Sequence, residues 1–115
     1  MAKFATVDEY LASLSEPHVT TVRAVLKVAL GAAPGLAVKL AWSIPQVHIG
    51  KHYVMGIAPA KAHISIAPWS KDSMVTFADR LAQYDPTDNM FRVPTNWKVD
   101  KALIVDLVRA RLSEM

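Results

Sequence analysis

The chain has 115 residues, of which 52% are hydrophobic, and its net charge of +3 results from 13 basic and 10 acidic side chains. We expect residues 1–115 to form a single domain, since this length suffices for one hydrophobic core. The absence of cysteine excludes disulfides and thiolate chemistry; with no signal-peptide pattern and no apolar run of membrane-spanning length, we expect a cytoplasmic protein that does not contact membranes.

Two helices are expected at the start of the chain. Thr6 to Glu9 fits a capping box, in which Thr6 caps the helix and Glu9 reaches back. The second helix should run from about Pro17 to Ala33, where Pro34-Gly35 would end it. Apolar residues recur at helical spacing in both segments: Val7, Tyr10, Leu11 and Leu14 in the first, and Val19, Val22, Leu26 and Leu30 in the second.

The strand signals lie between Leu36 and Ser70. Alternating apolar residues predict a strand over 36–42, and Pro45 should then force an edge, a bulge or a turn. A short strand over 46–49 should be followed by a turn at Gly50-Lys51.

The best-defined unit is a hairpin of strands 52–57 and 62–67, joined by a turn at 58–61 with Met55 opposite Ile64. The alternation predicts two faces. The apolar one should hold Tyr53, Met55, Ile57, Ile64 and Ile66, and the wetter one His52, Val54, Gly56, Lys61, His63 and Ser65.

Helical signals return after the strands. Ser70 should cap a helix over 71–83, residues 90–93 should form a short edge strand, and Asp100 should cap a last helix that ends near Ser113. Helices therefore flank a block of strands. This order predicts an α+β fold, with helices packed on one face of a small, mainly antiparallel β-sheet.

The sequence lacks the residue patterns that several classes of function require. The histidines His48, His52 and His63 have no acidic residue nearby in sequence, so we expect no metal site and no cofactor, although a site could recruit acids from the 85–88 loop. His63 and Ser65 share a strand face without an orienting acid or a nucleophile elbow, so we expect no catalytic residues and no enzyme. The basic residues are scattered, which argues against nucleic-acid binding.

The residues at the sheet include candidates for a ligand site. The aromatic residues there either pack within the fold or form the wall of a pocket. In the second case the histidines and Arg92 would supply the polar groups of that pocket. An arginine beside a neutral histidine suits an anion; the alternative is that Arg92 pairs with a loop acid such as Asp88. The ligand-binding candidates are Trp42, His48, His52, Tyr53, His63, Ser65, Trp69 and Arg92.

Four segments resemble the YdhG-like domain family: Thr6–Leu11, Trp42–Pro45, Lys61–Ser70 and Phe91–Pro94. The resemblance covers about residues 5 to 113. Where the family has an aromatic-glycine step, this chain has Trp42-Ser43. The resemblance implies a frataxin-like arrangement of helices on an antiparallel sheet, and some relatives are described as intracellular iron chaperones that serve iron–sulfur cluster assembly.

The resulting expectation is a small, non-enzymatic cytoplasmic domain that binds an unknown small ligand or protein partner, as a monomer or a homodimer. Two alternatives stay open: an intracellular iron chaperone, as the resemblance implies, and a protein-interaction module.

Overall fold

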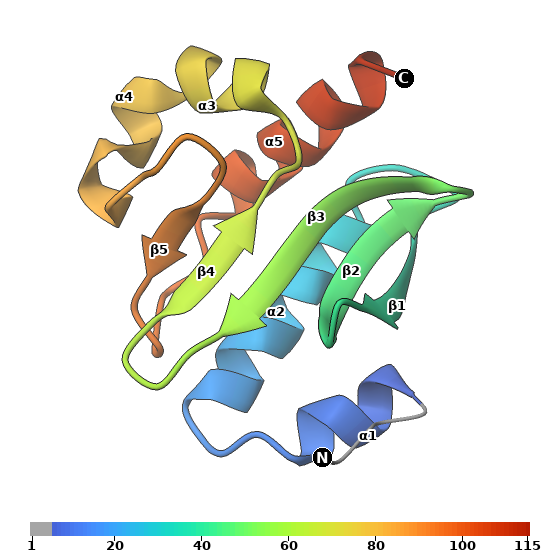
Figure 1. Cartoon of the computed structure of the whole chain (residues 1–115), viewed down its shortest axis with the longest axis vertical. Coiled ribbons are helices and arrows are strands. Elements are labelled where there is room, and N and C mark those ends of the chain that lie inside the picture. Colours follow the sequence, from blue (N-terminus) through green and yellow to red (C-terminus); the bar gives the residue numbers. More distant parts are fainter. Residues whose placement is uncertain (1–5) are drawn as a thin grey trace.

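The computed structural model describes residues 6–115. Its helices and strands follow one another along the chain as shown in Figure 1. In order they are α1 (Val7–Ala12), α2 (His18–Leu30), β1 (Ala37–Ala41), β2 (Ile44–Ile49), β3 (His52–Pro59), β4 (Ile64–Ala67), α3 (Lys71–Thr76), α4 (Ala78–Leu81), the 3-10 turn η1 (Ala82–Tyr84), β5 (Phe91–Val93) and α5 (Lys101–Ser113).

The strands form one antiparallel sheet in the order β1-β2-β3-β4-β5, so each strand pairs with its neighbour in sequence. Helices α2 and α5 lie against one face of the sheet, while α3 and α4 lie beyond the end of β4 (Figure 1). The α+β fold predicted from the sequence is therefore confirmed. No helix of residues 6–115 covers the opposite face of the central strands, which we call the open face (Figure 1).

The core lies between the sheet and the helices. Met55, Ile64 and Ile66 are fully buried, as the strand alternation predicts. They pack with the apolar sides of the helices, which supply Val22, Val25, Leu26, Leu103, Ile104, Leu107 and Val108. Burying side chains of this size is the main source of stability for a domain of this length.

The predicted caps are present at three helices. Thr6 accepts a hydrogen bond from the Glu9 amide, Ser70 from Ser73, and Asp100 from Leu103. The predicted helix over 71–83 is wrong as one unit, because the chain leaves helical geometry at Phe77 (φ −99°, ψ 15°). The apolar spacing continues through this bend, since Leu81 is fully buried, so periodicity alone could not reveal it.

The link between β1 and β2 also differs from the expectation. Ala41 pairs with Ile44, and both Trp42 (φ 51°) and Ser43 (φ 66°) are left-handed, which makes a two-residue hairpin turn of type I′. Pro45 does not interrupt the strand: it lies within β2 opposite Leu40, and the pairing of β2 with β3 begins one residue later at Gln46.

A β-bulge in β3 overturns part of the predicted hairpin faces. Val47 pairs with Met55 and His48 with Tyr53, so Val54 is an extra residue on the β3 side. The bulge turns Tyr53 onto the open face, away from Met55, and leaves Val54 fully buried. The predicted register is wrong as well, because Ile64 pairs with Pro59 and not with Met55.

Candidate functional site

Three aromatic side chains gather on the open face, and we call Trp42, Tyr53 and Trp69 the aromatic surface. Their ring centroids lie 4.7 Å (Trp42–Tyr53), 5.6 Å (Trp42–Trp69) and 6.3 Å (Tyr53–Trp69) apart. These are distances of rings in mutual contact, so the rings form a packed surface and leave no cage between them. Trp42 is nevertheless 66% exposed and Trp69 38% exposed. Such a contiguous exposed aromatic patch is typical of an interaction site.

The backbone beneath these rings is in an unfavourable conformation. Trp42, Ser43 and Trp69 all have positive φ, which costs about 1 kcal/mol or more for a residue with a side chain. The backbone strain at these three residues is thus located at the aromatic surface or directly beside it. Strain of this kind persists only where the surrounding structure enforces it.

Gln46 and Gly56 support the aromatic surface from below. Gln46 is fully buried, and its Oε1 accepts a hydrogen bond of 2.9 Å from Trp69 Nε1. Its amide lies across Gly56, the residue paired with it on β3: a Cβ at Gly56 would come within 2.7 Å of Gln46 Oε1. The missing side chain of Gly56 thus makes room for Gln46, which in turn fixes the indole of Trp69.

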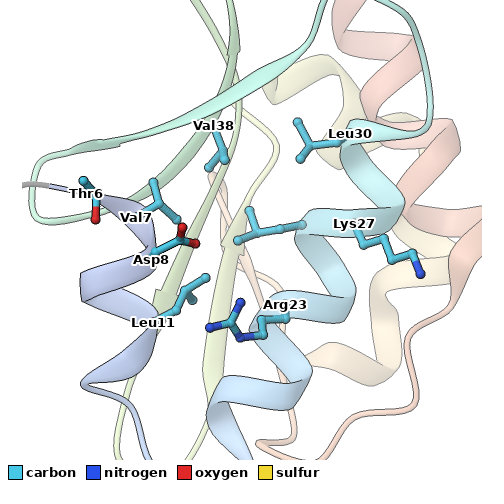
Figure 2. A pocket seen from close by; sticks show the side chains of 9 residues that line it. Thr6, Val7, Asp8, Leu11, Arg23, Lys27, Leu30 and Val38 are labelled. Atoms are coloured by element: carbon cyan, nitrogen blue, oxygen red, sulfur yellow. The ribbon is translucent and has the colours of Figure 1, made fainter.

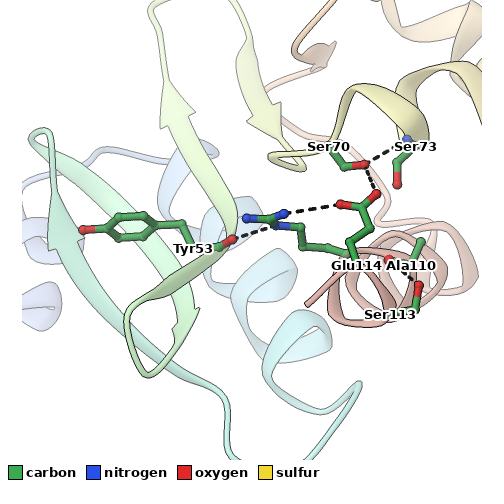
Figure 3. A network of polar contacts seen from close by, with 7 residues as sticks. Tyr53, Ser70, Ser73, Ala110, Ser113 and Glu114 are labelled. Atoms are coloured by element: carbon green, nitrogen blue, oxygen red, sulfur yellow. Dashed lines mark hydrogen bonds and ion pairs between the residues drawn. The ribbon is translucent and has the colours of Figure 1, made fainter.

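A polar network anchors two of the three aromatic residues from the helix side (Figure 3). Arg111 on α5 donates a hydrogen bond of 2.9 Å to the carbonyl of Tyr53 at the bulge, and its other nitrogen lies 3.3 Å from Glu114. Ser70, which follows Trp69, donates to Glu114. The Tyr53 ring points away from Glu114 in Figure 3. The end of α5 therefore holds the backbone of Tyr53 and the residue next to Trp69.

Lysine 39 adds a positive charge beside the rings. Its Nζ lies 5.3 Å from the centroid of the Tyr53 ring, a cation–π distance. Lys39 pairs with Gln46 across β1 and β2, so both face the open side. The sequence reasoning missed both residues. The available signal was the strand alternation: once Trp42-Ser43 is taken as a two-residue turn, Lys39 and Gln46 fall opposite each other.

The remaining candidates do not join this surface as one pocket. Ser65 and Arg92 pair directly on β4 and β5, but Arg92 Nη1 lies 2.7 Å from Asp85, so a loop acid other than Asp88 holds the guanidinium. His63 precedes β4, where its carbonyl accepts a hydrogen bond from the amide of Ala60.

The other two histidines of the sheet lie apart from each other. His48 pairs with Tyr53 on the open face, and its Nδ1 lies 3.1 Å from the Gly50 carbonyl. Because of the bulge, His52 lies on the opposite face of β3 from Gly56, at an exposed strand end, so the prediction that these two residues share the wetter face is wrong.

Within residues 6–115, no three histidine, aspartate or glutamate side chains come together in a group that could hold a metal ion. Burial raises the pKa of Tyr10, which lies on α1 and away from the aromatic surface. Over the same residues, no helix combines the length and the apolar character that a membrane span requires.

Comparisons with known proteins support the family resemblance. No protein-family model matches the sequence. The chain is 28% identical over 104 residues to a Bacillus subtilis protein named intracellular iron chaperone frataxin, in an alignment that covers 88% of this chain and 84% of that protein. Its fold matches the crystal structure of the Bacillus subtilis protein YdhG, of the DUF1801 family, with a TM-score of 0.84 and 25% identity over 95% of this chain and 90% of that one.

A second solved structure shares the fold only. It is a conserved protein from Lactobacillus casei, with a TM-score of 0.61 and 22% identity over 96% of this chain and 92% of that one. The agreement with YdhG extends over nearly the whole chain and includes the sheet and the helices that cover it. This chain therefore resembles the YdhG-like domain family and shares the α+β fold of its structural neighbour in the DUF1801 family.

Proposed function

We propose that this chain is a non-enzymatic cytoplasmic interaction domain, which binds a protein partner through the aromatic surface on the open face of its sheet. The observation that carries the proposal is the exposure of Trp42, 66% accessible on a strained turn and in contact with Tyr53 and Trp69. Tryptophan and tyrosine are the residues most enriched among those that dominate binding energy at protein interfaces.

The shape and charge of the surface favour a protein over a small molecule. The rings pack against each other and offer a broad surface, whereas small ligands are bound in concave sites. Lys39 beside Tyr53 supplies a positive charge at the rim. A partner surface with apolar side chains at its centre and a carboxylate near Lys39 fits this arrangement.

The surface is also held in place before binding. Gln46 fixes the Trp69 indole, and Arg111 fixes the backbone of Tyr53. Side chains that are already ordered lose less entropy when they bind, which strengthens association.

The test begins with a photo-crosslinking amino acid placed at Trp42 in the host cell, with the same substitution at Val75 as a matched control. Val75 is a large hydrophobic residue on α3 with 78% exposure, and it lies outside the aromatic surface. Crosslinks specific to position 42 identify the partner. The affinity of the purified pair is then measured by calorimetry for the wild type and for Trp42→Ala, Trp69→Ala and Val75→Ala.

We expect Trp42→Ala to weaken binding by about 30-fold or more, the effect of losing a dominant interface residue. Val75→Ala should bind like the wild type. If Trp42→Ala and Trp69→Ala bind with unchanged affinity, or if position 42 gives no specific crosslink, the proposal is wrong.

A role in iron delivery is the second candidate, and the observation that favours it is the similarity to the Bacillus subtilis iron chaperone. The described part of α1 contributes only Asp8 and Glu9 as acidic residues in its first turn. A chain with net charge +3 also attracts cations weakly. A stoichiometric, submicromolar ferrous site in the anaerobic protein would promote this candidate over the interaction domain.

A further inference from the structure

A cavity of about 600 Å³ lies between α1, α2 and β1, on the side of the sheet opposite the aromatic surface. Figure 2 shows side chains from both helices and from β1 converging on it. Its volume falls in the range of about 300–1,000 Å³ that is typical of small-molecule sites. The residues that line it are Thr6, Val7, Asp8, Leu11, Arg23, Leu26, Lys27, Leu30 and Val38.

The floor of the cavity is apolar. Leu11 from α1 and Leu26 from α2 are 3% and 5% exposed, so they form the deepest part of this floor. Leu30 and Val38 are half-buried and continue the apolar floor toward β1. An aliphatic chain placed here would replace water over a surface made by branched side chains.

Charged groups stand at the rim of the same cavity. Arg23 and Lys27 lie one turn apart on α2, both exposed, and within residues 6–115 neither has an ion-pair partner. Asp8 stands on the α1 side, and two bases minus one acid leave a net charge of +1. In Figure 2 the guanidinium of Arg23 points to the α1 side of the cavity, whereas the amine of Lys27 extends outward.

We propose that this cavity binds a medium-chain aliphatic monocarboxylate, with its chain on the leucine floor and its carboxylate at Arg23. The guanidinium offers a planar pair of donors that matches a carboxylate, and Lys27 adds to the local positive charge. Asp8 weakens the binding of this anion, because it brings a like charge close to the carboxylate.

Calorimetry with hexanoate, octanoate and decanoate, each below its micelle concentration, tests the apolar floor. Affinity should rise about fourfold for each added methylene, the factor that corresponds to burying one such group. Decan-1-ol, which lacks the charge, should bind about tenfold more weakly than decanoate. If affinity does not rise with chain length, or if decylammonium binds more tightly than decanoate, the proposal is overturned.

Three exposed positions test the charges without disturbing the core. Arg23→Gln should weaken decanoate binding by about tenfold and leave decan-1-ol binding unchanged. Asp8→Asn should strengthen decanoate binding. Lys51→Gln, which removes an exposed base in the β2–β3 turn, is the matched control and should behave like the wild type. Equal affinities of the wild type, Arg23→Gln and Asp8→Asn for decanoate would contradict the proposal.

Nuclear Overhauser contacts locate the bound chain independently of affinity. With methyl-labelled leucine, the methylenes of decanoate should show contacts to Leu11, Leu26 and Leu30. Contacts confined to the rings of Trp42 and Trp69 would place the ligand on the opposite side of the sheet and overturn the proposal.

Discussion

Replacing Gly56 by alanine tests whether Gln46 supports the aromatic surface. In the wild type, Gln46 lies across Gly56 and accepts the hydrogen bond of Trp69. A Cβ at position 56 would meet Gln46 Oε1 at 2.7 Å, Nε2 at 3.0 Å and Cδ at 3.2 Å. The end of a glutamine side chain can usually move aside, but Gln46 is fully buried beneath Trp69, so the indole would have to move with it.

The size of the effect follows from three contributions. Overpacking a filled site costs about 1–3 kcal/mol, and the loss of the Trp69–Gln46 hydrogen bond costs about 1 kcal/mol. Alanine is favoured over glycine in a strand by about 0.5–1 kcal/mol, since glycine loses more backbone entropy on folding. Gly56→Ala should therefore lower the free energy of unfolding by about 1–3.5 kcal/mol.

The effect of Gly56→Ala on the free energy of unfolding should change sign when the side chain of Gln46 is removed. In a Gln46→Ala background, the Cβ of Gly56→Ala no longer meets the amide of Gln46, and the substitution should raise the free energy of unfolding by about 0.5–1 kcal/mol. Urea denaturation of the four proteins measures both effects. The indole N–H resonance of Trp69 should shift in Gly56→Ala. If Gly56→Ala has the same effect in both backgrounds, Gln46 does not lie across Gly56 and our description of the open face is wrong.

Three further predictions concern the core, the first turn and metal binding. Ile64→Ala should lower the free energy of unfolding by about 2–5 kcal/mol, because Ile64 is fully buried; a loss below about 0.5 kcal/mol in urea denaturation would contradict the assigned sheet faces. Ser43→Gly should raise the free energy of unfolding by about 0.5–1 kcal/mol, because it relieves a left-handed residue with φ 66°; a loss of stability would refute the type I′ assignment. Ferrous ion should bind with a dissociation constant of tens of micromolar or weaker, since residues 6–115 hold no group of three carboxylate or histidine ligands; anaerobic calorimetry decides this.

Local patterns in the sequence predicted most of the elements. The caps at Thr6, Ser70 and Asp100 are present because the N-cap interaction depends only on residues three positions apart. The burial of Ile64 and Ile66 followed from alternation, since a strand without a bulge keeps a strict period of two. The resemblance to the YdhG-like family agreed with these patterns and with the fold.

The candidate site was predicted only in part. Trp42, Tyr53 and Trp69 were named as aromatic candidates, but Tyr53 was assigned to the buried face. The bulge at Val54 explains this error, because one extra residue puts the side chains before it, Tyr53 included, on the opposite face from the one that strict alternation with Met55 predicts. Arg92 was expected either at an anion site or with a loop acid, and it pairs with Asp85, which is seven residues away in sequence.

By itself, the sequence determined the α+β class, the three side-chain caps and the buried character of β4, because these depend on neighbours within one turn or one strand. Only the tertiary structure decided which aromatic residues meet and where the cavity lies. Trp42, Tyr53 and Trp69 come from three different segments. Their contact depends on a left-handed turn, a bulge and a glycine opposite a glutamine. Each of these features belongs to the pairing of two strands, and the side-chain periodicity of one strand does not specify it.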